Sequence, residues 1–159
     1  TGGQQLGRRG SGIRTTTKSD EKDKKLRDKW RIHICRHRFV MKRVETDTCV
    51  YFVGRNARDN WDLLDRSEPY DLFVHAANAP SCYVIAVSRS GDRDRSFDTG
   101  EVRYACELCV SHSSMRDSKF SDILYTRVGN VQKGRMAGQV RLLKSPDIMR
   151  VYGEGNEAV

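Results

Sequence analysis

The sequence predicts an α+β fold: a single domain with a mixed, mostly antiparallel β-sheet, two or three helices packed on it, and a basic N-terminal tail. Two observations indicate this class. Short runs of β-branched and aromatic residues alternate with polar turns through most of the chain, which is typical of antiparallel strands. Two other stretches place apolar residues at helical spacing. With 159 residues, of which 37% are hydrophobic, the chain can form one core of ordinary size.

The first thirty residues are expected to lie outside this core. Residues 1–19 are rich in Gly, Ser and Thr without periodicity, which predicts a flexible basic tail. Its start, TGGQQLGR, resembles an epitope tag, whereas its arginines and its lack of acids up to residue 17 also fit the remnant of a mitochondrial targeting segment. Both interpretations stay open. Residues 20–30 are predicted to form a charged helix, because acids precede cations in the order that a helix dipole favours.

A folded domain over residues 31–153 is expected to follow, with a C-terminal tail at 154–159. Apolar runs at 32–44 and 49–53 around the polar turn at 45–47 predict a β-hairpin. A helix should begin after the cap residue Asn56 and end before Pro69. The remaining expected elements are strands at 71–76 and 83–87, an exposed loop at 88–100, an amphipathic helix at 101–116, and strands at 122–128, 139–145 and 147–153.

Asp71 and His75 interrupt the apolar run of the first central strand. Four residues apart on a strand, their side chains would share one face but stand about 13 Å apart. That separation is too long for a general base and the group that orients it. We therefore expect these two residues to mark strand ends rather than a catalytic pair.

Positive charge is concentrated in the N-terminal third. The chain carries a net charge of +8, and residues 1–50 hold 14 Lys+Arg against 6 Asp+Glu, whereas residues 51–159 hold 15 of each. Residues 127–152 form a second basic segment, in which Asp147 is the only acid. Clustered cations indicate a polyanionic partner, with a solvated basic surface as the alternative. No apolar run approaches the roughly 18 residues of a membrane-spanning helix, so no membrane partner is expected.

Thiols and imidazoles offer one alternative chemistry. Cys106, Cys109 and His112 are spaced three apart and could ligate zinc if a fourth ligand approached, for instance from residues 33–37. On a helix, however, both cysteines fall on the apolar stripe, where free cysteine acts as a small hydrophobe. The odd total of five cysteines favours reduced thiols in an intracellular compartment. A zinc- or His-dependent enzyme stays an alternative, but no GxSxG, P-loop or HExxH motif occurs, so we expect no catalytic residues, metal or cofactor.

Two glycine-bearing turns carry cations. GRN at 54–56 places Arg55 at a predicted helix start, where the helix dipole favours an anion. The segment 126–144 combines three glycines with Lys133 and Arg135. Glycine leaves backbone amides accessible, so amides and cations can meet the same phosphate oxygens. An ordinary basic hairpin is the alternative for this segment.

The order of these segments resembles the NFACT-R domain, the RNA-binding domain of the NFACT family, whose members act in ribosome-associated quality control. The resemblance covers about residues 38–152. It is carried by the GRN turn, by DLFVHA at 71–76 where the family has DLWFHA, by Pro80 and Val84, and by Tyr125, Thr126, Lys133, Gly138 and Val140. Phe73 and Val74 replace the family's Trp and Phe, and residues 81–83 replace its Gly-Ser-His. Nothing here matches the family's upstream domains, which implies a stand-alone or excised module.

Resemblance and charge together predict a non-enzymatic module that docks on rRNA or tRNA through phosphate contacts. It would belong to a ribosomal particle, with the large subunit favoured, in the cytoplasm or the mitochondrion. A DNA- or anionic-surface-binding protein stays an alternative, and no small-molecule substrate is expected. The candidate RNA contacts are Arg55, Asn56, His75, Tyr83, Arg127, Lys133, Arg135, Arg141 and Lys144.

Overall fold

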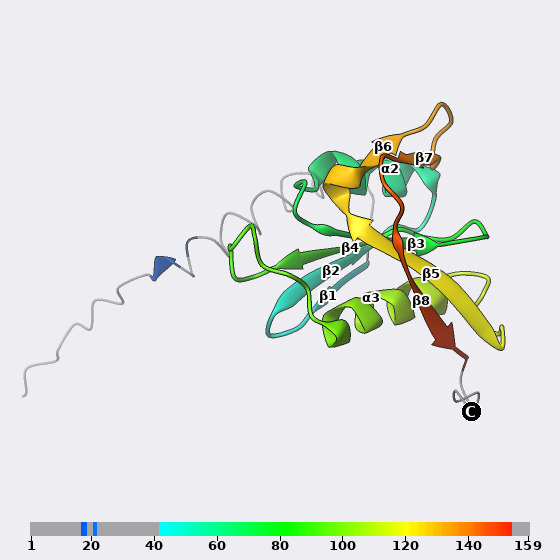
Figure 1. Ribbon diagram of the computed structural model, residues 1–159, viewed down its shortest axis with the longest axis horizontal. Helices are drawn as coiled ribbons and strands as arrows, with labels where there is room; N and C mark the ends of the chain where they lie inside the picture. Colours follow the sequence, from blue (N-terminus) through cyan, green and yellow to red (C-terminus); the bar gives the residue numbers. More distant parts are fainter. Residues whose placement is uncertain (1–16, 19–20, 22–41, 154–159) are drawn as a thin grey trace, which may run out of the picture.

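The computed structural model describes residues 17–18, 21 and 42–153 (Figure 1). Along residues 42–153 the elements are β1 (Lys42–Glu45), β2 (Cys49–Val53), α2 (Ala57–Arg66), β3 (Leu72–Ala76), β4 (Val84–Ser88), α3 (Thr99–Ser111), β5 (Phe120–Arg127), a 3-10 turn (Val128–Asn130), β6 (Val131–Lys133), β7 (Val140–Leu142) and β8 (Asp147–Tyr152). The predicted α+β class is confirmed. The predicted tails at 1–19 and 154–159, the helix at 20–30 and the first part of the hairpin lie outside the described residues, apart from positions 17, 18 and 21.

Six strands form one sheet in the order β1-β2-β4-β3-β5-β8, and each neighbouring pair is antiparallel. β6 and β7 pair with each other in a separate two-stranded hairpin. The strand expected at 139–145 is therefore shorter than predicted and belongs to this hairpin instead of the main sheet. The glycine-containing loop between β6 and β7 returns the chain directly onto β6, where the Gly134 amide donates to the Gln139 carbonyl at 2.7 Å.

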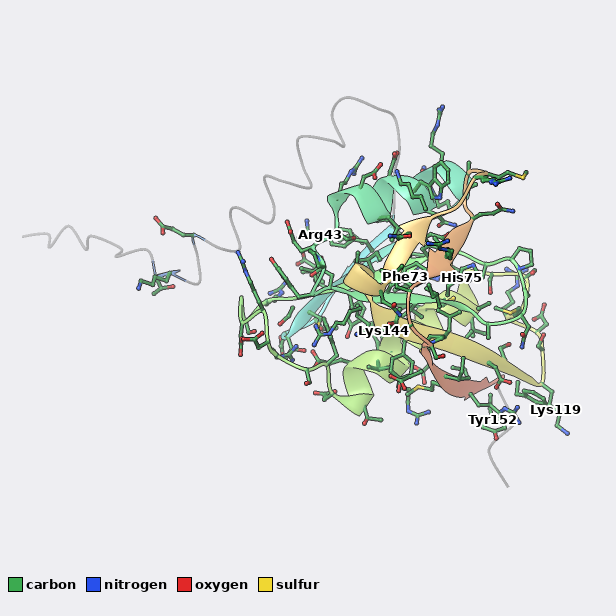
Figure 2. The ribbon with its side chains drawn as sticks, turned by 45° about the horizontal axis from the view of Figure 1, so that its top comes forward. Arg43, Phe73, His75, Lys119, Lys144 and Tyr152 are labelled. Atoms are coloured by element: carbon green, nitrogen blue, oxygen red, sulfur yellow. The ribbon has the colours of Figure 1, made fainter. Side chains whose placement is uncertain are left out.

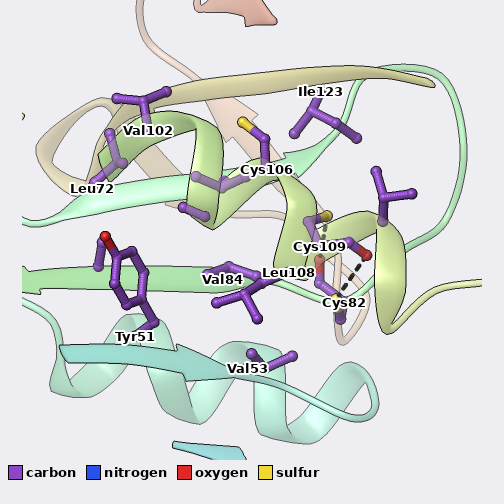
Figure 3. Close-up of a cluster of buried hydrophobic side chains, with 14 of the residues drawn as sticks. Tyr51, Val53, Leu72, Cys82, Val84, Val102, Cys106, Leu108, Cys109 and Ile123 are labelled. Atoms are coloured by element: carbon purple, nitrogen blue, oxygen red, sulfur yellow. Dashed lines mark hydrogen bonds between the residues drawn. The ribbon is translucent and has the colours of Figure 1, made fainter. Parts of the chain in front are cut away.

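The sheet has a different cover on each face (Figure 1). α3 lies against one face, and α2 with the β6–β7 hairpin lies on the other. Because side chains alternate along a strand, each buried strand contributes to both sides. On the α3 side, apolar side chains of the sheet pack against Val102, Cys106 and Cys109 (Figure 3). On the α2 side, Leu63 packs with a smaller cluster that contains Phe73.

Helix boundaries follow capping chemistry that the sequence shows only in part. α2 begins as predicted, because the Asn56 side chain accepts a hydrogen bond from the Asp59 amide at 2.9 Å. α3 begins two residues before its predicted start, since Asp98 and Glu101 form a reciprocal capping box. It also ends at Ser111 instead of residue 116, where the ring of the C-cap His112 donates from Nδ1 to the Leu108 carbonyl at 2.9 Å.

Asp71 and His75 mark the ends of β3, as predicted. Asp71 directly precedes the strand, and its side chain accepts a hydrogen bond from the Glu68 amide at 2.8 Å in the preceding turn. His75 is the penultimate residue of the same strand. Among the described helices, none is long and apolar enough to cross a membrane.

Candidate nucleic-acid interface

A groove of about 730 Å³ opens on the α2 side of the sheet. Three segments that are distant in sequence line it: the turn at 55–57 that leads into α2, the end of β3 with the following loop at 75–82, and the β6–β7 loop at 134–142. Asn60 of α2, His112 at the C-terminus of α3 and Leu124 of β5 also line it. The fold therefore brings together the GRN turn, the histidine-containing strand end and the glycine-rich basic loop.

Asn60 of α2 ties the first two segments together. Its side-chain oxygen accepts a hydrogen bond from the Tyr83 amide at 3.0 Å, and the Tyr83 carbonyl in turn accepts from the Gly54 amide at 3.0 Å. A Cβ on Gly54 would lie 2.2 Å from the Asn60 side-chain oxygen. Glycine at position 54 leaves room for the Asn60 side chain in the place where it accepts the hydrogen bond from Tyr83.

The β6–β7 loop is fastened to α2 and β4. The Tyr83 hydroxyl donates to the Gly138 carbonyl, and Trp61 Nε1 donates to the Gln139 carbonyl at 3.2 Å. Gly138 has a φ of +83°, and a Cβ at that position would meet the Ala57 Cβ at 3.0 Å. Glycine at 138 satisfies both the left-handed backbone and the close contact with the start of α2.

Arg55 and Lys133 lie at opposite ends of α2. Arg55 Nε is 3.0 Å from the buried carboxylate of Asp59, in the first turn of the helix. Lys133 Nζ is 2.6 Å from Asp65 in the last turn and 5.0 Å from the centre of the Trp61 ring. Six residues of helix separate the two carboxylates by about 9 Å along the axis and by roughly 120° around it. Arg55 lines the groove, whereas Lys133 is outside its lining, and each of the two cations already has an acidic partner.

The side chains of Arg135, Arg141 and Lys144 are exposed and form no ion pair with any residue in 42–153. Arg135 follows the groove-lining Gly134. Arg141 lies between the groove-lining residues of β7, so its side chain points to the outer face of the hairpin, where it donates to Gln132 at 3.3 Å. The hairpin and the residues that follow it thus carry three cations that are free to meet a ligand, and Arg58, Arg103 and Lys119 are also exposed without an ion pair among residues 42–153.

His75 and Tyr83 are ring neighbours with different exposures. Their centroids are 5.1 Å apart, His75 is half-buried at the groove, and Tyr83 is completely buried. Burial lowers the pKa of His75, so its ring is uncharged at neutral pH. Burial also raises the pKa of Tyr83 to about 12. His75 can offer a neutral ring to a ligand, whereas we assign Tyr83 to positioning the β6–β7 loop, because its side chain has no exposed surface.

The remaining two candidates also support the backbone. Arg127 donates to the carbonyls of Tyr70 and Arg95, the latter at 2.6 Å, and its guanidinium lies 5.2 Å from the Phe97 ring centre. These contacts anchor the loop between β4 and α3 and lie apart from the groove. Asn56 uses its side chain to cap α2 but lines the groove. Arg127 therefore does not belong to the candidate interface, whereas Asn56 does.

The thiols belong to the core on the opposite side of the sheet. Cys106 and Cys109 have 0% exposure, and Cys109 Sγ lies 3.5 Å from the Cys82 carbonyl (Figure 3). His112 is not bonded to these thiols and lines the groove: since its Nδ1 donates to the Leu108 carbonyl, its Nε2 accepts from Lys42 Nζ at 2.8 Å. Within the described part of the chain, no group of three or more His, Cys, Asp or Glu side chains is arranged to hold a metal ion.

Sequence reasoning missed Asn60, Trp61 and Leu124. Asn60 had a detectable signal, because asparagine is a poor helix former and stands in the middle of a predicted helix. Trp61 stands at helical spacing with Ala57 and Leu64, which gives no sign of a contact outside the helix, yet it is partly exposed and donates a hydrogen bond to the hairpin. Leu124 carried no signal, since its place in the groove depends on the pairing of β3 with β5.

Comparisons with known proteins identify a family and a relative with a similar fold. The family model described as the NFACT protein RNA-binding domain matches residues 36–145. Among solved structures, the chain is similar to the C-terminal part of the fibronectin/fibrinogen-binding protein from Streptococcus suis, with a TM-score of 0.57 and 17% identity. The match covers 86% of this chain and 58% of that one, so this chain spans less than two thirds of its relative. At such identity the likeness shows the fold alone. No curated protein matches the sequence.

Proposed function

Because this chain belongs to the NFACT protein RNA-binding domain family, we propose that it is a non-enzymatic RNA-binding module that docks on ribosomal RNA or tRNA mainly through phosphates. The observation that supports this most is the groove. Family membership makes RNA the partner, and the three segments that carry the family's motifs converge on that one groove.

Exposed cations near the groove fit phosphate contacts. Arg135 and Lys144 are exposed, Arg141 is exposed on the outer face of the hairpin, and Arg55 lines the groove at the N-terminus of α2. Such contacts position a protein on RNA without reading its sequence. The neutral ring of His75 lies deeper in the groove and would contact a ribose or a base.

The ribosome is the proposed location of this RNA. Residues 1–50 carry a surplus of eight positive charges, 14 minus 6, which suits attachment to a large polyanion. We propose association with a ribosomal particle, with the large subunit favoured, in the cytoplasm or the mitochondrion. Sedimentation of the endogenous protein with and without ribosomal particles tests this proposal directly.

The test of RNA binding uses two matched pairs of substitutions in the full chain. Arg135→Gln with Arg141→Gln removes two cations of the hairpin. Arg103→Gln with Arg116→Gln removes two exposed cations of the α3 side and serves as the control. Affinities for an rRNA fragment, tRNA and duplex DNA are measured over a range of salt concentrations.

We expect the hairpin variant to bind RNA more weakly, with a slope of log K against log salt that is shallower by about 1 to 2, because each lost phosphate contact removes roughly 0.7 to 0.9. The control should match the parent chain. If both pairs weaken binding equally, or if duplex DNA binds as well as RNA, the chain is a generic polycation and the proposal fails.

A further inference from the structure

No helix or strand among residues 42–153 covers the sheet face between β5 and β8 on the α2 side. Phe120, Ile148 and Tyr152 are 44%, 53% and 40% exposed there. The other exposed large hydrophobics of the described chain, Met136 and Leu143, lie in the β6–β7 loop and just after β7. Apolar exposure is thus confined to the C-terminal segment that also builds the groove.

Strand register places these side chains on the same face as the groove. Phe120 is opposite Tyr152, and Leu124 is opposite Ile148. Between them, Ile123 and Val151 point to the α3 core. Leu124 lines the groove and is also opposite His75. The groove floor therefore continues across β5 onto β8, and Phe120 lies about 13 Å farther along the strand than Leu124.

The far end of this face carries three planar side chains. The ring centres of Phe120 and Tyr152 are 6.5 Å apart with their planes tilted by 55°, and the Arg150 guanidinium lies 4.1 Å from the Phe120 ring centre. Asp122 holds that guanidinium through contacts of 2.8 and 3.1 Å. Lys119 precedes Phe120, and its backbone carbonyl accepts from the Gly153 amide at 3.0 Å. In Figure 2 Lys119 and Tyr152 lie together at one end of the sheet, away from His75.

We propose that this face, formed by Phe120, Tyr152, Arg150 and Ile148, is a stacking platform for unpaired RNA bases; this inference rests on the proposed function. Aromatic rings and guanidinium planes on an open sheet are the groups on which splayed bases stack. Asp122 neutralises Arg150, so the platform has little net charge and suits bases more than phosphates. The hairpin cations beside the groove would hold the backbone of the same strand. The preferred ligand is therefore single-stranded RNA.

The test compares bases with backbone. The full chain is titrated with a short oligouridylate, with an oligomer of the same length whose sugars lack bases, and with duplex RNA. The variant is Phe120→Ala with Tyr152→Ala, and the matched control, Phe120→Tyr with Tyr152→Phe, keeps both rings. We expect the alanine variant to bind oligouridylate at least about fivefold more weakly, the loss of one stacked base. Binding of the abasic oligomer should stay unchanged, and the ring-conserving control should match the parent chain.

Ultraviolet crosslinking of the unmutated chain to oligouridylate is a second measurement that does not depend on the variant's folding. Crosslinked peptides should contain Phe120 or Tyr152.

Three outcomes would overturn the proposal. If the alanine variant binds oligouridylate like the parent chain and no such crosslink forms, this face does not bind bases, while RNA binding through the groove stands. If the parent chain is a dimer that the alanines dissociate without a change in RNA affinity, the face is an interface between copies. If the parent chain binds no RNA, the proposed function itself falls.

Discussion

The two faces of the sheet differ in how they use polar groups. On the α3 side they are satisfied internally: the Glu101 carboxylate accepts from Cys49 Sγ at 2.6 Å, from Thr48 at 3.0 Å and from Arg95 at 2.7 Å. On the α2 side they join separate segments, as Asn60 and Tyr83 do, and cations remain exposed at the rim. The α3 side therefore mainly stabilises the fold, whereas the α2 side combines a buried cluster with exposed groups that can bind a ligand.

The largest loss of stability is expected for Glu101→Ala. Glu101 is 6% exposed, and its removal leaves Arg95, Cys49 and Thr48 without their acceptor. We expect a loss of about 3–5 kcal/mol in the free energy of unfolding, the usual cost of breaking a buried charge pair. Denaturant unfolding measures it. Glu107→Ala, on the exposed side of the same helix, should change stability by less than about 0.5 kcal/mol. A comparable loss in both variants would contradict a special role for the Glu101 cluster.

Acid titration probes the same cluster. Burial alone would raise the pKa of Glu101, but hydrogen bonds from Arg95, Cys49, the Asp98 amide and Thr48 outweigh it and hold the pKa at about 2, below the ordinary 4.5. A depressed folded pKa contributes stability that is present above about pH 4.5 and is lost as the pH falls toward 2. The loss should reach at most about 3 kcal/mol. Glu101→Gln should lack that part of the pH dependence of the free energy of unfolding. If both proteins lose the same stability between pH 4.5 and 2, Glu101 is not the group responsible.

Gly54→Ala tests whether the α2 side couples stability to binding. The added methyl would lie 2.2 Å from the Asn60 side-chain oxygen, so that side chain must move and give up its hydrogen bond from the Tyr83 amide. We expect a loss of about 2 kcal/mol, typical of overpacking, together with weaker RNA binding. Gly100→Ala, in the first turn of α3, meets only the Asp98 side chain at 3.2 Å and is the control. It should leave RNA affinity unchanged. If Gly54→Ala binds RNA with wild-type affinity, the geometry of the groove is not required for RNA binding.

The smallest effect on stability and on RNA binding is expected at Lys133. Lys133 and Asp65 form an ion pair with 35% and 60% exposed side chains, so Lys133→Gln should cost no more than about 1 kcal/mol in stability. Because Lys133 already has an acidic partner, its loss should weaken RNA binding less than the loss of Arg135. Parallel salt titrations of the two single variants check this order. A larger effect at Lys133 would mean that RNA displaces Asp65.

The candidate site was predictable where chemistry is local and not where it depends on pairing. Residues at glycine turns, such as Arg55 and Arg135, carry their charge and backbone freedom in the sequence itself. Tyr83 and Arg127 could not be assigned in this way, because only the fold shows that one is buried under the β6–β7 loop and the other is held by backbone carbonyls. The same reason explains why Asn60 and Leu124 were missed.

The amino-acid sequence alone was enough to predict the α+β class, the cap at Asn56, the ends of β3 and the family to which the chain is similar. These depend on periodicity, on capping and on motif order, all of which act over short distances along the chain. Only the tertiary structure decided that β6 and β7 leave the main sheet, which cations keep acidic partners, and that the groove continues onto the face of β5 and β8. Those features depend on strand order and register, and residues that are distant in sequence become neighbours only once the sheet has formed.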